Sequence, residues 1–202
     1  MKIAILADIH GNSIALSKVV EDIQSIGGVD EYLFLGDFVA LGPDPIGVME
    51  QISKLSNARF IRGNTDRYIC TGELPWPQFA DVIKDPTLAE LHIQIVRSFS
   101  WTTGAVGASG WLPWFKELPL DTHFVLPDGS RVLAVHAVPG TDDGTGISLN
   151  ISDEALLELV SNVDAGLVLV GHTHLPFDRT VRNIRVVNPG SVSNPFSPGF
   201  TS

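Results

Sequence analysis

The sequence of 202 residues contains one cysteine, no cationic run and no long apolar run. The single cysteine, Cys70, excludes an internal disulfide, which agrees with a reducing compartment. Lysine and arginine number 13 against 23 acidic residues, and their scatter argues against binding to a nucleic-acid polymer. No apolar stretch is long enough to span a bilayer. Residues 2–7 are too short for a secretory signal, so we expect a core strand there and a cytoplasmic protein.

Hydrophobic residues make up 44% of the chain and charged residues 18%, an ordinary globular profile that fits one domain over residues 1–202. In the first third, β-like runs alternate with segments of helical period. Three such units in succession predict a parallel sheet with right-handed crossovers. The expected strands are 2–7, 32–35 and 59–62, and the expected helices are 13–26 and 46–55.

The middle of the chain, residues 71–118, contains all four tryptophans and no cluster of catalytic side chains. Helices are expected over 88–101 and 110–118. This segment can form a helical flap over a functional site. It can equally pack on the sheet to complete the core, and the sequence leaves both roles open.

The second half is rich in strands with short connections. Two strands, 123–126 and 131–135, are joined through Pro127-Asp128-Gly129 as a hairpin. A helix is expected from Ser152 to Val160 with Ser152 as its N-cap. A further strand covers 167–170, and 178–187 forms two strands turning near Asn183. One half favouring parallel and one favouring antiparallel pairing predict two mixed sheets face to face, with helices outside.

Seven oxygen and nitrogen donors follow the ends of these apolar runs, and they are the most informative feature of the chain. Such donors suit borderline and hard divalent metals. Seven are too many for one four-coordinate zinc site, but they fit two metals that share a carboxylate. The seven residues are Asp8, His10, Asp37, Asn64, His136, His172 and His174.

The spacing within the segments supports this interpretation. Asp8 and His10 lie two residues apart after a strand, so both can reach one metal. Gly36 lets the backbone approach closely where Asp37 must point inward, and a carboxylate there can bridge two cations. The Gly63-Asn64 pair is read as a turn. His92 and His123 lie outside the segments and are interpreted as structural or surface residues.

The order of the motifs resembles the calcineurin-like metallophosphoesterase superfamily. The motifs are Asp8-x-His10, Gly36-Asp37, Gly63-Asn64-x-Asp66, His136 and Gly171-His172-x-His174. Two further segments, Leu41-Gly42-Pro43-Asp44-Pro45 and Asn188-Pro189-Gly190-Ser191, are similar to those of its small bacterial and archaeal phosphodiesterases. The resemblance implies an α/β fold of the α+β kind, a four-layer αββα sandwich.

The resemblance also implies roles for individual residues. Asp37 would bridge the two metals, and a bridging water or hydroxide would be the nucleophile, with Asn64 and His136 as further catalytic residues. Asn12, Thr65, Asp66, Arg67 and Asn188 would orient the ligands or bind the substrate. One metal would be held by Asp8, His10, Asp37 and His174, and the other by Asp37, Asn64, His136 and His172.

The chain departs from the family pattern at Thr65, where many members carry a histidine that assists the leaving group. Threonine does not readily donate a proton near neutral pH, so we expect activated esters to react best. The chain also ends soon after Ser191, whereas relatives usually continue for one or two strands, so we expect a shortened or compact member.

We therefore predict a metal-dependent phosphodiesterase acting on a small phosphorylated substrate. A phosphomonoesterase or phosphoprotein phosphatase, a dinucleoside polyphosphate hydrolase and a metal-free interaction scaffold are the alternatives. The cofactor would be two divalent ions, with manganese expected and iron, zinc, nickel or cobalt also compatible with the donors. The sequence leaves the oligomeric state open.

Overall fold

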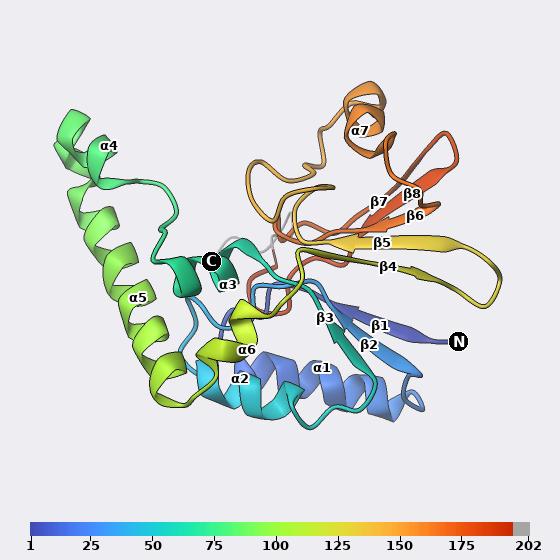
Figure 1. Ribbon diagram of the computed structural model, residues 1–202, viewed down its shortest axis with the longest axis horizontal. Helices are drawn as coiled ribbons and strands as arrows, with labels where there is room; N and C mark the ends of the chain where they lie inside the picture. Colours follow the sequence, from blue (N-terminus) through green and yellow to red (C-terminus); the bar gives the residue numbers. More distant parts are fainter. Residues whose placement is uncertain (196–202) are drawn as a thin grey trace.

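Two β-sheets face each other in the computed structural model, which describes residues 1–195, and helices cover their outer faces (Figure 1). The first sheet has three parallel strands in the order β1-β2-β3. The second has five strands in the order β4-β5-β6-β8-β7. The strands are β1 (Ile3–Leu6), β2 (Glu31–Phe34), β3 (Ala58–Phe60), β4 (Asp121–Val125), β5 (Arg131–Val135), β6 (Leu167–Leu169), β7 (Phe177–Val181) and β8 (Ile184–Asn188).

The pairing directions follow from the connections. A helix crosses over between β1 and β2, and another between β2 and β3, so the described pairings of the first sheet are all parallel. In the second sheet two hairpins, β4–β5 and β7–β8, are antiparallel, while β6 pairs in parallel with both β5 and β8. The parallel pairing predicted for the first three strands is thus confirmed, and of the two mixed sheets expected, the second is the mixed one.

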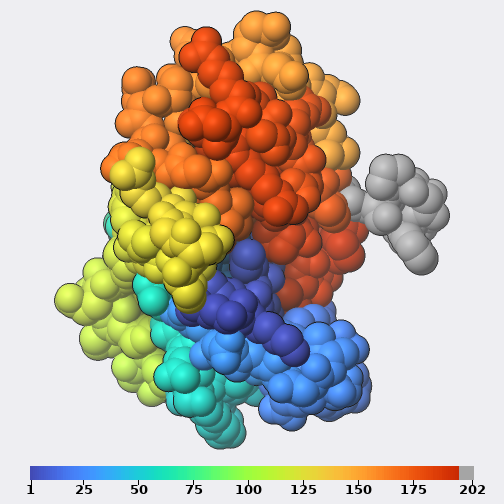
Figure 2. Space-filling model, turned by 90° about the vertical axis from the view of Figure 1, so that its right-hand side faces the viewer, coloured from blue at the N-terminus to red at the C-terminus, as the bar shows by residue number. Residues whose placement is uncertain are grey.

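Alternation along the strands builds separate core layers. Leu33 and Leu35 face the space between the sheets, whereas Tyr32 and Phe34 face the helices. In β5, Val132 and Ala134 likewise enter the inter-sheet layer. Two sheets with an apolar layer between them and one outside each make the four-layer α/β sandwich. In Figure 2 the first strand, dark blue, lies between the two halves of the chain.

The outer helices begin where the sequence supplies caps. Helix α1 (Ser13–Ser25) starts at Asn12, whose side chain accepts the N–H of Ala15, and it packs beside α2 (Pro45–Ile52) on the first sheet. Helix α7 (Asp153–Val160) covers the second sheet, and its predicted N-cap, Ser152, accepts the N–H of Ala155.

The turn predicted at Gly63-Asn64 is wrong, because helix α3 (Asn64–Thr71) begins there. It is only eight residues long and mostly polar, so the apolar signal that marks a helix in a sequence is weak there. The Asp66 carboxylate accepts the N–H of Gly63 at 2.9 Å, which stabilises the first turn. The asparagine therefore stands at a helix N-terminus rather than in a loop.

The segment 71–118 folds into α4 (Phe79–Lys84), the short 3₁₀ helix η1 (Pro86–Leu88), α5 (Ala89–Ala108) and α6 (Leu112–Lys116). Helix α5 runs seven residues beyond its predicted end, because Thr102 and Val106 are buried and packing offsets the weak helix propensity of its glycines. Its C-terminal half and α6 complete the core on the first sheet.

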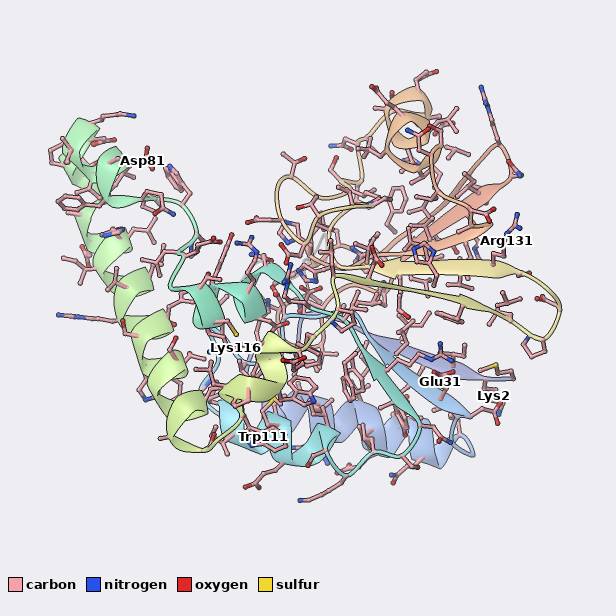
Figure 3. All side chains as sticks on the ribbon, viewed as in Figure 1. Lys2, Glu31, Asp81, Trp111, Lys116 and Arg131 are labelled. Carbon is pink, nitrogen blue, oxygen red and sulfur yellow. The ribbon has the colours of Figure 1, made fainter. Side chains whose placement is uncertain are left out.

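Helix α4 and the N-terminal half of α5 project away from both sheets and form an arm (Figure 1). Figure 3 places Asp81 at the far end of this arm and Trp111 near its base. Whether residues 71–118 cover the functional site as a flap stays a prediction. Among residues 1–195, no helix has the length and apolar character needed to cross a bilayer.

The aromatic cluster under α6 provides the first test. Phe115 is fully buried, and its ring lies 5.0 Å from Trp114 and 6.3 Å from Phe38. Phe115→Ala should lower the free energy of unfolding by about 3–5 kcal/mol, because it leaves a cavity. Phe79→Ala, at a side chain that is 66% exposed, is the matched control and should change it by less than about 0.5 kcal/mol. Urea unfolding measures both, and equal losses would contradict the assigned core.

Candidate metal centre

All seven predicted donors meet at one end of the sandwich. Each follows the C-terminal end of a strand that runs in the same direction as its parallel neighbours: β1, β2, β3, β5 and β6. Because parallel strands end at a common edge, residues distant in sequence are brought together there. The donors are Asp8 and His10 after β1, Asp37 after β2, Asn64 after β3, His136 after β5, and His172 and His174 after β6.

Asp37 occupies the middle of the cluster. Its Oδ2 atom lies 3.6 Å from Nε2 of His10 and 3.5 Å from Nε2 of His136. Its Oδ1 atom accepts the N–H of Thr65 at 3.0 Å. A carboxylate between two imidazoles from opposite sheets is placed where a bridging ligand would be needed.

Glycines allow this approach. Gly36 has a φ of +92°, and a Cβ there would collide with the backbone of Gly63. A Cβ at Gly63 would in turn collide with the Asp37 carboxylate. The close approach inferred at Gly36 is therefore confirmed, and it involves both glycines.

Asp8 lies on the other side of the cluster and is fully buried. Its Oδ2 atom accepts the N–H of His172 at 3.1 Å. Its Oδ1 atom makes no hydrogen bond and lies 3.4 Å from Nε2 of His174. An unbonded buried carboxylate oxygen is costly, and a cation would satisfy it.

Two groups of side chains have metal-binding spacing, with ligand atoms within 4.8 Å of one another. One is Asp8, His10 and His174, and the other is Asp8, Asp37 and His136. Asp8 belongs to both groups by distance, whereas the resemblance implied that it serves one metal. Oδ1 of Asn64 lies 3.1 Å from Nε2 of His136 and 3.1 Å from Nδ1 of His172, which places the asparagine and His172 on the His136 side.

Each of the four histidines uses one ring nitrogen on a backbone carbonyl. A nitrogen that bonds a carbonyl must carry a proton, so the other nitrogen, which faces the cluster, is the one that would bind a metal. Such outer hydrogen bonds orient the metal-ligating histidines of known proteins. The pairs are His10 Nδ1 with Ala40 O at 3.1 Å, His136 Nδ1 with Leu35 O at 2.6 Å, His172 Nε2 with Gly144 O at 2.9 Å, and His174 Nδ1 with Asn194 O at 3.2 Å.

The donor set fits two divalent cations. It combines four imidazoles, two carboxylates and an amide oxygen, the ligands that manganese, iron and zinc accept. The unbonded Oδ1 of Asp8 and the carbonyl-bound histidines are independent signs that the site is built for a cation.

The backbone at these positions is strained. Among the described residues, eight that are not glycine have positive φ, and five of the eight are predicted ligands. Left-handed backbone at such residues costs about 1–3 kcal/mol each and is concentrated at functional sites. The five are Asp8, His10, Asp37, His172 and His174, with φ between 46° and 69°.

Charge and burial shift the pKa values of the cluster in opposite directions. Burial lowers the pKa of His136, but the Asp37 carboxylate, with a smaller contribution from Asp8, outweighs burial and raises it to about 10. Burial raises the pKa of Asp37, yet His136 and His10 hold it well below its usual range. Burial dominates at His10 and lowers its pKa. Without metal, the centre is therefore an ion pair between Asp37 and a protonated His136.

Two of the predicted supporting residues hold backbone turns in the structure. Asp66 accepts the N–H groups of Asp37 and Phe38 at 2.8 and 3.0 Å as well as that of Gly63. Burial, together with the nearby Asp37 charge, raises the pKa of Asp66 to about 7. Asn188 donates to Gly171 O at 2.6 Å and so fixes the turn that carries His172.

The other three supporting residues are placed differently. Asn12 caps α1 and donates to Ser193 Oγ at 3.4 Å. Thr65 is buried, and its hydroxyl makes no hydrogen bond. The Arg67 guanidinium binds Asp142 and Asp143 of the loop 139–146 at 3.1 and 2.8 Å.

The loop 139–146 supports the site through two acidic residues that the sequence did not single out. Asp142 is buried and is bound by Arg62 at 2.7 Å in addition to Arg67, and Tyr68 donates to Asp143 at 2.6 Å. These bonds fix the loop whose Gly144 carbonyl holds His172. The only sequence signal was the acidic pair within a glycine-rich loop, which by itself is typical of a surface turn.

Comparison with known proteins agrees with the fold and the family. The calcineurin-like phosphoesterase superfamily domain matches residues 1–201. The uncharacterized protein MJ0912 of Methanocaldococcus jannaschii is 28% identical over 192 residues, which cover 94% of this chain and 69% of that protein.

Two solved structures are similar over nearly the whole chain. The hypothetical protein PH1004 of Pyrococcus horikoshii has a TM-score of 0.76 and 23% identity, covering 95% of this chain and 77% of the other. A metallophosphoesterase of Sphaerobacter thermophilus has a TM-score of 0.69 and 25% identity, covering 96% and 78%. The chain belongs to the calcineurin-like phosphoesterase superfamily, as its motifs predicted.

The central position of Asp37 predicts that its replacement weakens metal binding at both groups of ligands. Asp37→Asn removes the negative charge between the two groups, so bound metal should fall from about two ions per chain to fewer than one. Metal analysis after equilibration with manganese measures this. Asp178→Asn, which breaks the exposed pair with Arg185, is the control and should leave the metal content unchanged. Full occupancy in Asp37→Asn would contradict the bridging position.

The raised pKa of His136 predicts proton release on metal binding. The ring is protonated at pH 7 without metal, since its pKa is about 10, whereas a metal ligand must be neutral. Binding should therefore release about one proton from this ring, and affinity should weaken as the pH falls. Calorimetric titration with manganese in two buffers of different ionisation enthalpy measures the released protons. Heats that are independent of the buffer would refute the Asp37–His136 ion pair.

Proposed function

We propose that this protein is a cytoplasmic metal-dependent phosphodiesterase that uses two divalent ions, manganese being the expected metal, on a small phosphorylated substrate. The observation that carries the proposal is the arrangement of the four histidines. Each one is held by a backbone carbonyl on one nitrogen while the other faces Asp8, Asp37 or Asn64. The residues that would hold the ions are Asp8, His10, Asp37, Asn64, His136, His172 and His174.

Two bound cations would neutralise phosphoryl oxygens and lower the pKa of water, which makes hydroxide available as a nucleophile near neutral pH. The chain itself supplies position and exclusion of solvent. Asp8, Asp37 and His136 are almost completely buried, so their charges interact in a medium of low polarity. The Asn64 amide oxygen at the start of α3 lies 3.1 Å from a ring nitrogen of both His136 and His172, so it would bind the same metal as these two histidines.

A diester fits the site better than a monoester. A monoester carries a charge near −2 at neutral pH, whereas a diester carries −1. The two arginines near Asn64, Arg62 and Arg67, are already bound by Asp142 and Asp143. The chain also has a net charge of −10, which repels a dianion more strongly than a monoanion.

The position after Asn64 also limits which leaving groups the site can expel. Thr65 follows Asn64, and its hydroxyl is buried and does not titrate near neutral pH. No group at that position can protonate a poor leaving group. We therefore expect esters of acidic alcohols or phenols to be the better substrates.

The expected activity is manganese-dependent hydrolysis of bis-p-nitrophenyl phosphate. Its kcat/KM should exceed that for p-nitrophenyl phosphate by at least about tenfold, a barrier difference of about 1.4 kcal/mol. Asn64→Ala should lower it by about 10–100-fold, as the loss of a metal-site residue does in other enzymes. Release of nitrophenolate measures both.

The outcomes separate the alternatives. A preference for the monoester would favour a phosphatase. Hydrolysis of dinucleoside polyphosphates alone would favour a dinucleoside polyphosphate hydrolase. Absence of both bound metal and hydrolysis would favour an interaction scaffold. Leu159→Asn on the far surface of α7 serves as the control for Asn64→Ala and should keep full activity.

A further inference from the structure

Leu41 combines two features that are unfavourable in a leucine. Its φ is +77°, in the left-handed region that favours glycine, and its side chain is 57% exposed. The first costs conformational free energy, and the second leaves a large apolar group in water. Neither feature helps the fold, so the residue is a candidate for a role in binding.

The backbone on both sides of Leu41 is fixed by the metal centre. The carbonyl of Ala40 bonds to Nδ1 of His10, and the N–H of Asp44 donates to Gly11 O at 2.9 Å. A Cβ at Gly42 would collide with the carbonyl of His10. The chain is therefore pressed against the His10–Gly11 turn, and Leu41 is forced to point outward rather than into the core.

The outward side chain lines a pocket of about 250 Å³ beside the metal centre. The pocket is smaller than the sites of about 300–1,000 Å³ that hold whole drug-sized ligands, so it suits one small organic group. Two of its walls are His10 and His174, whose Nε2 atoms lie 3.0 Å apart within the proposed metal site. The lining residues are His10, Leu41, Gly42, His174, Ser193 and Asn194.

We infer that this pocket is a subsite for an apolar organic group of the phosphodiester, an aryl or alkyl ester group, with Leu41 as its principal contact. The inference rests on the proposed function. A phosphate held at the metal centre would direct one ester group past His10 and His174 onto Leu41. The lining within the described chain contains no Lys, Arg, Asp or Glu side chain, so an uncharged group is favoured over an ionic one.

The strain at Leu41 separates this role from a structural one. Asparagine and glycine tolerate left-handed backbone better than leucine does. Leu41→Asn and Leu41→Gly should therefore leave the melting temperature unchanged or raise it by about 2–4 °C. A leucine retained for stability would show a lower melting temperature in both variants.

The binding test compares two diesters that differ only in their organic groups. Diphenyl phosphate should bind the manganese-loaded protein at least about tenfold more tightly than dimethyl phosphate, because an aryl group buries more apolar surface. Leu41→Asn should reduce this ratio to about threefold or less, with little change for dimethyl phosphate. Competitive inhibition of bis-p-nitrophenyl phosphate hydrolysis and calorimetry both measure the ratio. Leu159→Asn, at a leucine that is 37% exposed and outside the pocket, is the matched control and should keep the ratio.

The outcomes distinguish this inference from the proposed function. If the protein loaded with metal neither binds nor hydrolyses any diester, the proposed function fails and the subsite fails with it. If it hydrolyses diesters but binds the two ligands equally, the subsite alone is refuted. A ratio that survives in both Leu41→Asn and Leu41→Gly would also overturn the role of Leu41. Loss of the ratio with an unchanged or higher melting temperature is the result that supports it.

Discussion

Four hydrogen bonds that histidine rings donate to backbone carbonyls are the interaction on which the site depends. Without them an imidazole can rotate or change tautomer, and its second nitrogen no longer points at the other proposed ligands. The carbonyls belong to Leu35, Ala40, Gly144 and Asn194, in three segments far apart in the chain. The position of each ring is therefore set by the whole sandwich, because a shift of either sheet would break at least one of these bonds.

Strained backbone persists at the strand ends because it directs the proposed ligands over the edge of the sheet. A residue in the left-handed region reverses the chain sharply, so a side chain just after a strand can turn back over the edge of the sheet. Asp8, Asp37 and His172 all use this geometry. The strain is offset by the apolar layers directly below, where Leu35 and Ala134 are fully buried between the sheets. Stability of the core thus maintains a site that is locally unfavourable.

Much of this could be predicted from the sequence, because the relevant signals are local. Alternating apolar residues gave the strands to within one or two residues, and Ser152 marked the start of α7. Donor residues after strands identified the seven side chains that the structure gathers. Helix α3 was missed because it is short and mostly polar, and its first turn is stabilised by the Asp66 carboxylate. The carbonyl partners and the left-handed backbone are properties of the folded chain and leave no residue-type signal.

The loop 139–146 both orients a proposed metal ligand and sets the charge that a substrate would meet. Its acidic residues bind Arg62 and Arg67, which removes two cations from the vicinity of Asn64 and at the same time fixes Gly144 against His172. A change in that loop would alter both the charge that a substrate meets and the orientation of a proposed metal ligand. Leu41 likewise combines the two roles, because it lines the proposed subsite and follows Ala40, whose carbonyl holds His10. Substrate contacts and ligand supports are therefore neighbours in sequence, so the walls of this site cannot vary independently of its centre.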